Sequence, residues 1–342
     1  MSILEVEFQY PELFKGIINI LKDSITEANI FFLKSQNGVP SIFISETDST
    51  KNVLVELKMD GKYFVRYHAN KNQIKIGINM ILFSNVLRAV EKDDTLILRM
   101  LENKEDIIQI LYPKKNKEIF TENKNKEENE ENEGNEGNEK NGENEDHNKK
   151  NKKKNKNGKK TVKPVKKNNK KEEKIRMPKD ELKLIELDIN KLRVPKQDYD
   201  AIITIYSSEF VKICKNMSIA GSDVEIRCYD NNVSFTSFGD MLNREVIYED
   251  DNSDERLVAL TNNGSEDKII KGKYDLKNFL SFIKCCGFCE YIWIHMINNN
   301  PLVIEYDLEN IGKMKIMVGP VMDDVKNISG KDYYTDEEDD NY

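Results

Sequence analysis

Residues 201–220 read AIITIYSSEFVKICKNMSIA, and this stretch decides how the fold is interpreted. Its first six residues are mostly β-branched or aromatic, which favours a strand. In the residues that follow, apolar and cationic side chains recur at helical spacing on opposite faces. The apolar face carries Phe210, Ile213, Cys214 and Met217, and the polar face carries Ser208, Lys212 and Lys215. We therefore predict a strand followed by an amphipathic helix with a basic outer face.

Three further segments combine an apolar face with cations in the same way. They are Leu13–Asp23, Ile81–Val90 and Leu276–Cys286, and together with Ser207–Ser218 they make four predicted helices. Their polar faces carry, in that order, Lys15, Asn19 and Lys22; Asn85 and Arg88; and Lys273, Lys277 and Lys284. Since the chain as a whole is acidic, four basic helix faces indicate one localised surface that contacts a polyanion.

The charge of the chain is unevenly distributed. The 342 residues carry a formal net charge of −8, yet residues 114–174 contain 20 lysines and only 14 acidic residues. Apolar side chains are almost absent from these residues, so burial cannot offset the entropy cost of ordering them. We therefore predict a disordered insertion. Its basic half fits a nuclear-import signal, a loose nucleic-acid arm or a solvated segment without a role.

Short β-rich runs surround the predicted helices in a repeated order. In the first half they are Ser2–Tyr10, Ser41–Ser45, Asn52–Lys58, Tyr63–Tyr67, Ile74–Ile78, Thr95–Met100 and Ile107–Tyr112. In the second half they are Ala201–Tyr206, Val224–Tyr229, Asn232–Thr236, Glu245–Tyr248, Leu257–Leu260, Tyr291–Ile297, Leu302–Tyr306 and Lys313–Val318. A unit of one strand, one helix and three or four strands thus occurs four times. Because each unit is too small to bury its apolar face alone, the units should pack in pairs.

The sequence lacks the common motifs of catalysis and of metal binding. The three histidines are scattered, and Cys286 and Cys289 form a lone CxxC without a second pair, so we expect the five cysteines to be reduced and mostly buried. No apolar run approaches the roughly 18 residues of a membrane helix. We therefore predict a soluble, intracellular protein that is not an enzyme, has no cofactor or metal, and does not associate with a membrane.

The segment Glu181–Val224 carries the most specific family signal. It reads ELKLIELDINKLRVPKQDYDAIITIYSSEFVKICKNMSIAGSDV, and it resembles the connector and second-domain start of the eukaryotic sliding clamp, proliferating cell nuclear antigen (PCNA). Further resemblance to this family lies in Phe14–Asp23, Asp48–Leu57, Phe64–Asn70 and Asn300–Pro320.

The resemblance implies the α+β DNA clamp fold, in which each of two similar domains holds two βαβββ units. Three subunits form a closed ring, and the helices line its hole. The implied DNA-binding residues are Lys15, Lys22, Arg88, Lys212, Lys215, Lys277 and Lys284, all of which the helical pattern also selects. These cations would contact phosphates without reading bases. The neighbouring subunit is expected to pair with Asn243–Asp250, with apolar contacts from Cys214, Met217 and Ile219.

The resemblance also implies a pocket in which partner proteins insert the aromatic anchors of a short motif. By position, the pocket comprises Thr47, Leu54, Leu192, Val194, Pro195, Pro301, Met317, Gly319 and Pro320. The residues Thr47, Lys51, Asn52 and Met317 differ from those usual in the family. Asp230 stands where many members have the lysine that receives ubiquitin.

Together these observations predict an N-terminal clamp domain over residues 1–183 that contains the insertion 114–176. A connector over residues 184–200, a C-terminal clamp domain over 201–325 and an acidic tail over 326–342 follow. The implied function is a nuclear, homotrimeric clamp that encircles double-stranded DNA, acts as a processivity factor for DNA polymerase, and docks the clamp loader and other replication and repair proteins. The alternatives are a divergent paralogue or a subunit of a hetero-trimeric checkpoint-type clamp, and an RNA-binding or chromatin protein that acts through the insertion.

Overall fold

The computed structural model of the chain describes residues 1–34, 39–114, 178–189, 192–229, 231–249, 257–262 and 269–321. Nearly all of the predicted insertion, the whole predicted tail and Asp230 lie outside these residues.

The N-terminal half contains two βαβββ units separated by one strand. The first unit is β1 (Ser2–Phe8), α1 (Pro11–Leu21), β2 (Glu27–Lys34), β3 (Pro40–Thr47) and β4 (Val53–Asp60). A short 3₁₀ turn, η1 (Gly61–Tyr63), and β5 (Phe64–Ala69) follow. The second unit is β6 (Gln73–Asn79), α2 (Met80–Leu87), β7 (Leu96–Leu101), β8 (Lys104–Leu111) and β9 (Lys179–Lys183).

The C-terminal half repeats this order. Its first unit is β10 (Ala201–Tyr206), α3 (Ser207–Ala220), β11 (Asp223–Tyr229), β12 (Asn232–Phe238) and β13 (Asn243–Glu249). After β14 (Leu257–Asn262), the second unit is β15 (Ile270–Asp275), α4 (Leu276–Phe282) with a 3₁₀ turn η2 (Ile283–Phe288), β16 (Tyr291–Met296), β17 (Leu302–Leu308) and β18 (Gly312–Val318). The repeated unit inferred from the sequence is therefore present four times.

Three antiparallel sheets arrange these strands. A five-stranded sheet has the order β5-β1-β7-β8-β9, and a four-stranded sheet has the order β13-β12-β11-β15. The third sheet, β14-β10-β16-β17-β18-β4-β3-β2-β6, takes strands from both halves. It joins them where β18 pairs with β4, with Ile316 opposite Val55. A continuous β-ladder thus fixes the two halves to each other.

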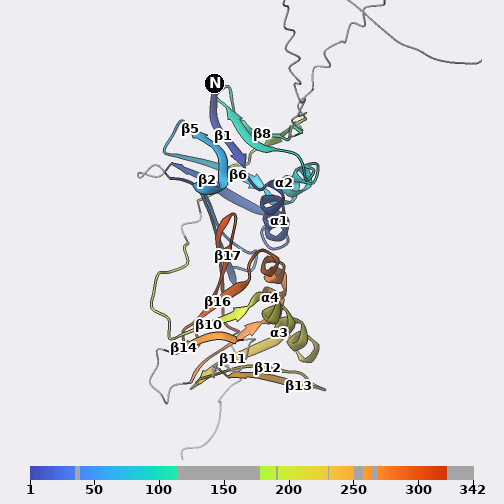
Figure 1. Ribbon diagram of the computed structural model, residues 1–342, viewed down its shortest axis with the longest axis vertical. Coiled ribbons are helices and arrows are strands. Elements are labelled where there is room, and N and C mark those ends of the chain that lie inside the picture. The colour runs from blue at the N-terminus through green and yellow to red at the C-terminus, as the bar shows by residue number, and fades with distance from the viewer. Residues whose placement is uncertain are drawn as a thin grey trace, which may run out of the picture. The chain divides into compact units, whose positions relative to one another are not determined.

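The four helices lie on the same side of the sheets, whereas the strands form the other side (Figure 1). Local sequence explains where two of them begin. Asn79 caps α2 by accepting a hydrogen bond from the Leu82 amide at 2.9 Å, and Asp275 caps α4 through the Lys277 amide at 2.7 Å. Their apolar faces are buried in one continuous core. The opposite, polar faces of the four helices therefore share one surface.

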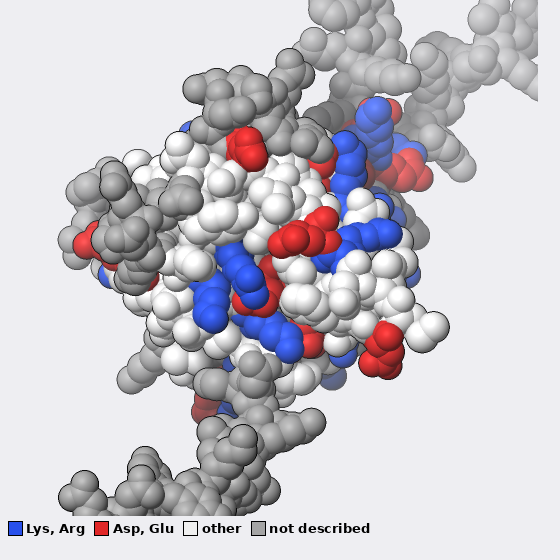
Figure 2. Space-filling model, turned by 90° about the horizontal axis from the view of Figure 1, so that it is seen from below, with Lys and Arg blue, Asp and Glu red and all other residues white. Residues whose placement is uncertain are grey.

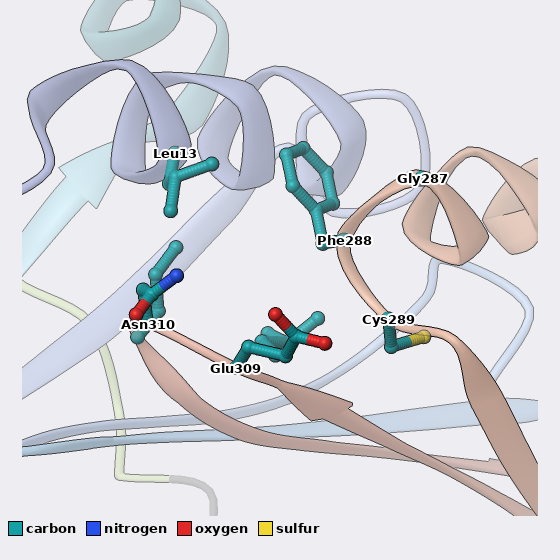
Figure 3. A pocket seen from close by; sticks show the side chains of 8 residues that line it. Leu13, Gly287, Phe288, Cys289, Glu309 and Asn310 are labelled. Atoms are coloured by element: carbon teal, nitrogen blue, oxygen red, sulfur yellow. The ribbon is translucent and has the colours of Figure 1, made fainter.

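A small cavity of about 290 Å³ lies where α1 meets the turn between β17 and β18. Phe288 points from η2 toward α1, and Glu309 and Asn310 lie below it (Figure 3). A Cβ at Gly16 would meet the Phe288 ring at 2.8 Å, so the glycine permits this close approach. The junction packs the first half of α1 against Phe288 of η2.

The structure corrects several details of the sequence prediction. The strands β2 and β15 were not predicted, because adjacent Phe31 and Phe32 are both buried in β2 and break its alternation, and because β15 is rich in lysine. Lys273 lies in β15 and not on a helix face. The α4 helix ends at Phe282, after which the chain tightens into η2 and turns Cys285 and Cys286 into the core.

The predicted interface contacts of α3 need a second correction. Cys214 and Met217 belong to the buried core of their own chain and are at most 1% exposed. They lie on the apolar face of the helix, which the sheet covers. Ile219, in contrast, is 66% exposed and remains available to a neighbour.

Candidate nucleic-acid interface and partner pocket

The seven predicted DNA-binding cations lie on or directly beside the four helices. Arg88, Lys212, Lys215, Lys277 and Lys284 are exposed, whereas Lys15 and Lys22 are half-buried. Lys15 lies in α1, Lys212 and Lys215 in α3, and Lys277 in α4. Lys22 and Arg88 are the residues that follow α1 and α2, and Lys284 lies in η2.

Several of these cations are held by partners within the chain. The Nζ of Lys15 donates a hydrogen bond to the carbonyl of Val90 at 2.8 Å, which ties α1 to the end of the α2 segment. Lys22 and Lys284 both contact the carboxylate of Asp23, at 2.8 and 3.2 Å. The pKa of Asp23 is lowered chiefly by its hydrogen bond with Lys22 and also by Lys284, whereas desolvation opposes this shift. Asp23 thus holds two cations from different halves of the chain together.

The cation of Lys212 is held in the same manner. Its Nζ lies 2.8 Å from Oε2 of Glu209, one helical turn earlier. The other carboxylate oxygen accepts a hydrogen bond from the hydroxyl of Tyr248 on β13, at 3.0 Å. Lys212 on α3 and Tyr248 on the edge strand β13 therefore share the carboxylate of Glu209.

Positive and negative side chains are interspersed on the surface of the C-terminal half. On the face drawn in Figure 2, which looks up from the lower end of Figure 1, lysines and arginines alternate with acidic residues. On the helices, Lys22, Lys212 and Lys284 form ion pairs within the chain, and a phosphate must compete with these pairs, so their contacts with a polyanion should be weak.

The connector lies across the outer face of the large sheet. Val194 is only 8% exposed and packs with Leu54 and Val303, and Tyr199 and Met317 complete this apolar cluster. The Ser45 hydroxyl donates a hydrogen bond to the carbonyl of Leu192 at 2.9 Å.

Arg193 gives the connector a third attachment. Its guanidinium lies 4.3 Å from the centroid of the Phe43 ring and 3.9 Å from the carboxylate of Glu56. Burial raises the pKa of Glu56, although a hydrogen bond with the Val194 backbone and the charge of Arg193 oppose the shift. The segment from Leu192 to Val194 is therefore anchored on β3 and β4.

A row of charged side chains borders the apolar cluster. Glu56, Lys315 and Glu305 lie directly opposite one another on β4, β18 and β17. Glu305 is within 3.6 Å of His295, 2.9 Å of Lys315 and 3.2 Å of Lys313. These three neighbours hold the pKa of Glu305 well below its usual range, despite its partial burial. The His295 ring also contacts that of Tyr199, at 4.7 Å between centroids.

Comparison with known proteins identifies the family. The family model described as proliferating cell nuclear antigen, N-terminal domain, matches residues 3–131, and the corresponding C-terminal domain model matches residues 193–321. The chain belongs to the PCNA family. It is therefore a sliding clamp and a processivity factor for DNA polymerase in DNA replication, and neither match favours the hetero-trimeric alternative.

A solved structure supports the fold. The crystal structure of proliferating cellular nuclear antigen from Entamoeba histolytica aligns with a TM-score of 0.66 at 20% sequence identity, over 94% of this chain and 100% of that chain. The two-domain clamp fold expected from the resemblance is thereby confirmed.

The residues predicted to form the partner pocket come from β3, β4, the connector, and β18 with the residues beside β17 and β18. Cross-strand register brings Thr47, Leu54 and Met317 side by side on one face, and Val194 covers this face. Strand alternation places Pro301 and Gly319 on the same face, one residue beyond the ends of β17 and β18. Leu192 and Pro195 are exposed on the connector. Pro320 lines a separate cavity of about 280 Å³ with Lys271 and Asn299.

Two residues of the apolar cluster around Val194, Val303 and Tyr199, were not predicted from the sequence. Val303 is fully buried beneath the connector, and the Tyr199 ring contacts that of His295 at a tilt of 41°. The outward position of Val303 could have been inferred from the alternation of β17, since Leu302 and Ile304 are core residues. The position of Tyr199 depends on where the connector docks, which no local pattern indicates.

The cysteines and the described charged residues suggest no further chemistry. All five cysteines are free thiols, and four of them are buried. Burial raises the pKa of Cys228 and of Cys286 to about 12, so these groups stay protonated at neutral pH. Among the described residues, no group of three or more potential ligands could hold a metal ion, and no helix is long and apolar enough to cross a membrane.

Proposed function

We propose that three copies of this chain close head to tail into a homotrimeric ring around double-stranded DNA. The observation that carries this proposal concerns two sheet edges. Within the described residues, β9 pairs only with β8, and β13 pairs only with β12. An exposed strand edge is a template for another chain, and two different edges joined heterologously generate a ring when the rotation closes.

Exposed apolar side chains next to both edges support this arrangement. Beside β13 lie Ile219, Phe238, Met241 and Leu242, each at least 41% exposed. They are contiguous, because a Cβ at Gly239 would lie 1.8 Å from the carbonyl of Ala220. Near β9, α2 exposes Ile81 and Leu82, and the segment after β9 bridges β6, from which α2 starts. Burying these groups in a subunit interface would remove apolar surface from water.

In this proposal, the seven helix cations contact phosphates of the enclosed duplex. Internal pairing to Asp23 and Glu209 weakens the contacts of Lys22, Lys284 and Lys212, so the ring can move along DNA while its closure retains it. The connector face binds short motifs of DNA polymerase, the clamp loader and repair proteins. The protein acts in the nucleus as a non-enzymatic platform, without a cofactor or metal of its own.

The native mass of the full chain tests the ring. Light scattering at micromolar concentration should give three times the mass of the chain, 39.8 kDa. The double substitution Ile219→Glu and Met241→Glu should shift the protein to monomers, because it buries charges at the interface. Val65→Glu is the matched control, since Val65 is 62% exposed on β5, at the other edge of the sheet from β9. A monomeric wild-type protein would contradict the proposal.

A further inference from the structure

We propose that Glu209 is a positioning residue that holds the ring-closing strand β13 to α3 and, in doing so, masks the DNA-facing charge of Lys212. This inference rests on the homotrimeric, DNA-encircling function proposed above. It assigns to one carboxylate an effect on both subunit assembly and DNA association.

The geometry divides the carboxylate of Glu209 between two partners. The residue is only 8% exposed, near the start of α3. Its Oε1 accepts the hydrogen bond of the Tyr248 hydroxyl, and its Oε2 lies 2.8 Å from Nζ of Lys212. Because each oxygen has its own donor, both contacts can form at once. A buried carboxylate needs such partners, since an unpaired one is costly.

The contact with Tyr248 fixes an edge strand from inside. Tyr248 is 2% exposed, and its ring meets that of Phe235 edge to face, with 6.1 Å between centroids. At the start of β13, Arg244 donates a hydrogen bond to the carbonyl of Asn216 on α3 at 3.1 Å. The strand is therefore attached to the helix at two points. A strand held in this way presents its free edge to a neighbouring subunit in a fixed orientation, which reduces the entropy cost of assembly.

The contact with Lys212 has the opposite effect on DNA association. The Lys212 side chain is 65% exposed, so a phosphate can reach it, but the phosphate must displace or share the ion pair with Glu209. A cation already neutralised within the protein releases fewer counterions when DNA binds. Glu209 should therefore lower the affinity of the clamp for DNA while it supports the closed ring.

Two substitutions separate these effects. Glu209→Gln retains a carbonyl oxygen for the Tyr248 hydroxyl and removes the negative charge beside Lys212. We expect the association constant for a short DNA duplex, measured by fluorescence anisotropy, to increase about three- to tenfold at low salt. The slope of log K against log salt concentration should become more negative by up to about 0.9 for each Lys212 that gains a phosphate contact. Adding Lys212→Met should reverse both changes.

Tyr248→Phe removes the hydroxyl that reaches Glu209 and leaves Lys212 paired. The dissociation constant of the trimer, measured by sedimentation equilibrium, should rise about five- to tenfold, which corresponds to about 1 kcal/mol. The salt dependence of DNA association should not change. Tyr274→Phe is the control, because this buried phenol on β15 at the other edge of the same sheet donates to the carbonyl of Asn300 at 2.9 Å. It should lower stability equally but leave assembly unchanged.

These outcomes distinguish the inference from the function on which it rests. If Glu209→Gln does not strengthen DNA association, or if Tyr248→Phe and Tyr274→Phe affect the trimer equally, the role of Glu209 is overturned. If the wild-type protein is itself a monomer, or associates with DNA independently of salt, the proposed ring is wrong instead. Thermal unfolding of each variant shows whether it is folded at the temperature of the binding and sedimentation measurements.

Discussion

Lys284 lies 3.2 Å from the carboxylate of Asp23. The lysine belongs to η2 in the C-terminal half, and the aspartate follows α1 in the N-terminal half. Lys22 approaches the other oxygen of the same carboxylate at 2.8 Å. Asp23 therefore contacts both Lys22 and Lys284, two predicted DNA-binding residues that are 262 positions apart in the sequence.

Asp23→Asn should strengthen DNA association. The substitution frees the charges of Lys22 and Lys284 for phosphates, so the salt dependence should steepen by up to about 0.9 for each new phosphate contact. Stability should change little, because Asp23 is exposed and exposed ion pairs contribute at most about 1 kcal/mol. Asp60→Asn is a suitable control, since its pair with Lys58 lies on the outer face of β4. Equal effects of the two variants on DNA association would exclude a special role for Asp23.

Replacing four of the five exposed cations, Arg88, Lys212, Lys215 and Lys277, together with Ala should reduce clamp loading and polymerase processivity. The slope of log K against log salt should become less negative by roughly one for each lost phosphate contact, without a change in sequence preference. Folding should be nearly unaffected, because these side chains are exposed. Lys15 is omitted, since its bond to Val90 supports the packing of α1. A charge-matched control replaces Lys58, Lys62, Lys71 and Lys75, and the hypothesis fails if this control loses as much processivity.

Local pattern was sufficient to predict most of the fold. The helix predicted over Ser207–Ser218 was evident because its apolar and polar residues alternate at helical spacing, and the structure bears out its start at Ser207 and extends it to Ala220. Strand β2 was not evident, because it is buried on both faces and therefore lacks the alternation of a half-exposed strand. The family of the chain could be inferred from Glu181–Val224, and the domain matches confirm it.

The partners of the site residues could not be predicted in the same way. Helical spacing indicated that Lys212 faces outward, yet its pairing with Glu209 and the link to Tyr248 depend on how β13 packs on α3. The attachment of Arg193 to Glu56 and Phe43 likewise joins residues more than 130 positions apart. Such contacts arise from tertiary packing, for which a single sequence carries no periodic signal.

Glu305→Gln should destabilise the clamp at neutral pH by about 1–3 kcal/mol, because it removes a partly buried anion that three basic groups contact. The pKa of Glu305 in the folded protein lies below its ordinary value near 4.5. Its ionised form therefore adds stability above that value, and this contribution is lost as the pH falls through the lowered pKa. The difference in unfolding free energy between wild type and variant should shrink below about pH 4.5. Asp307→Asn, which removes a more exposed carboxylate on the same strand, should show little effect at any pH.

Substitutions in the connector should separate support of the pocket from contact with a partner. Leu192 is 56% exposed, whereas Val194 is 8% exposed and packs on Leu54 and Val303. Leu192→Ala should weaken binding of a polymerase-derived motif peptide about tenfold, which corresponds to about 1.4 kcal/mol, and leave thermal stability unchanged. Val194→Ala should weaken peptide binding to a similar extent and also lower stability by about 1 kcal/mol, because it leaves a cavity under the connector.

Lys51→Ala provides the matched control for these two variants. Lys51 is exposed in the turn between β3 and β4, at the rim of the predicted pocket, so its loss should change peptide affinity less than twofold. Titration calorimetry should also give a negative heat-capacity change for the wild type, as expected when apolar surface is buried. The pocket assignment is wrong if Lys51→Ala has the largest effect. It is also wrong if Leu192→Ala binds the peptide as tightly as wild type, because an exposed anchor contact must then lie elsewhere on the clamp.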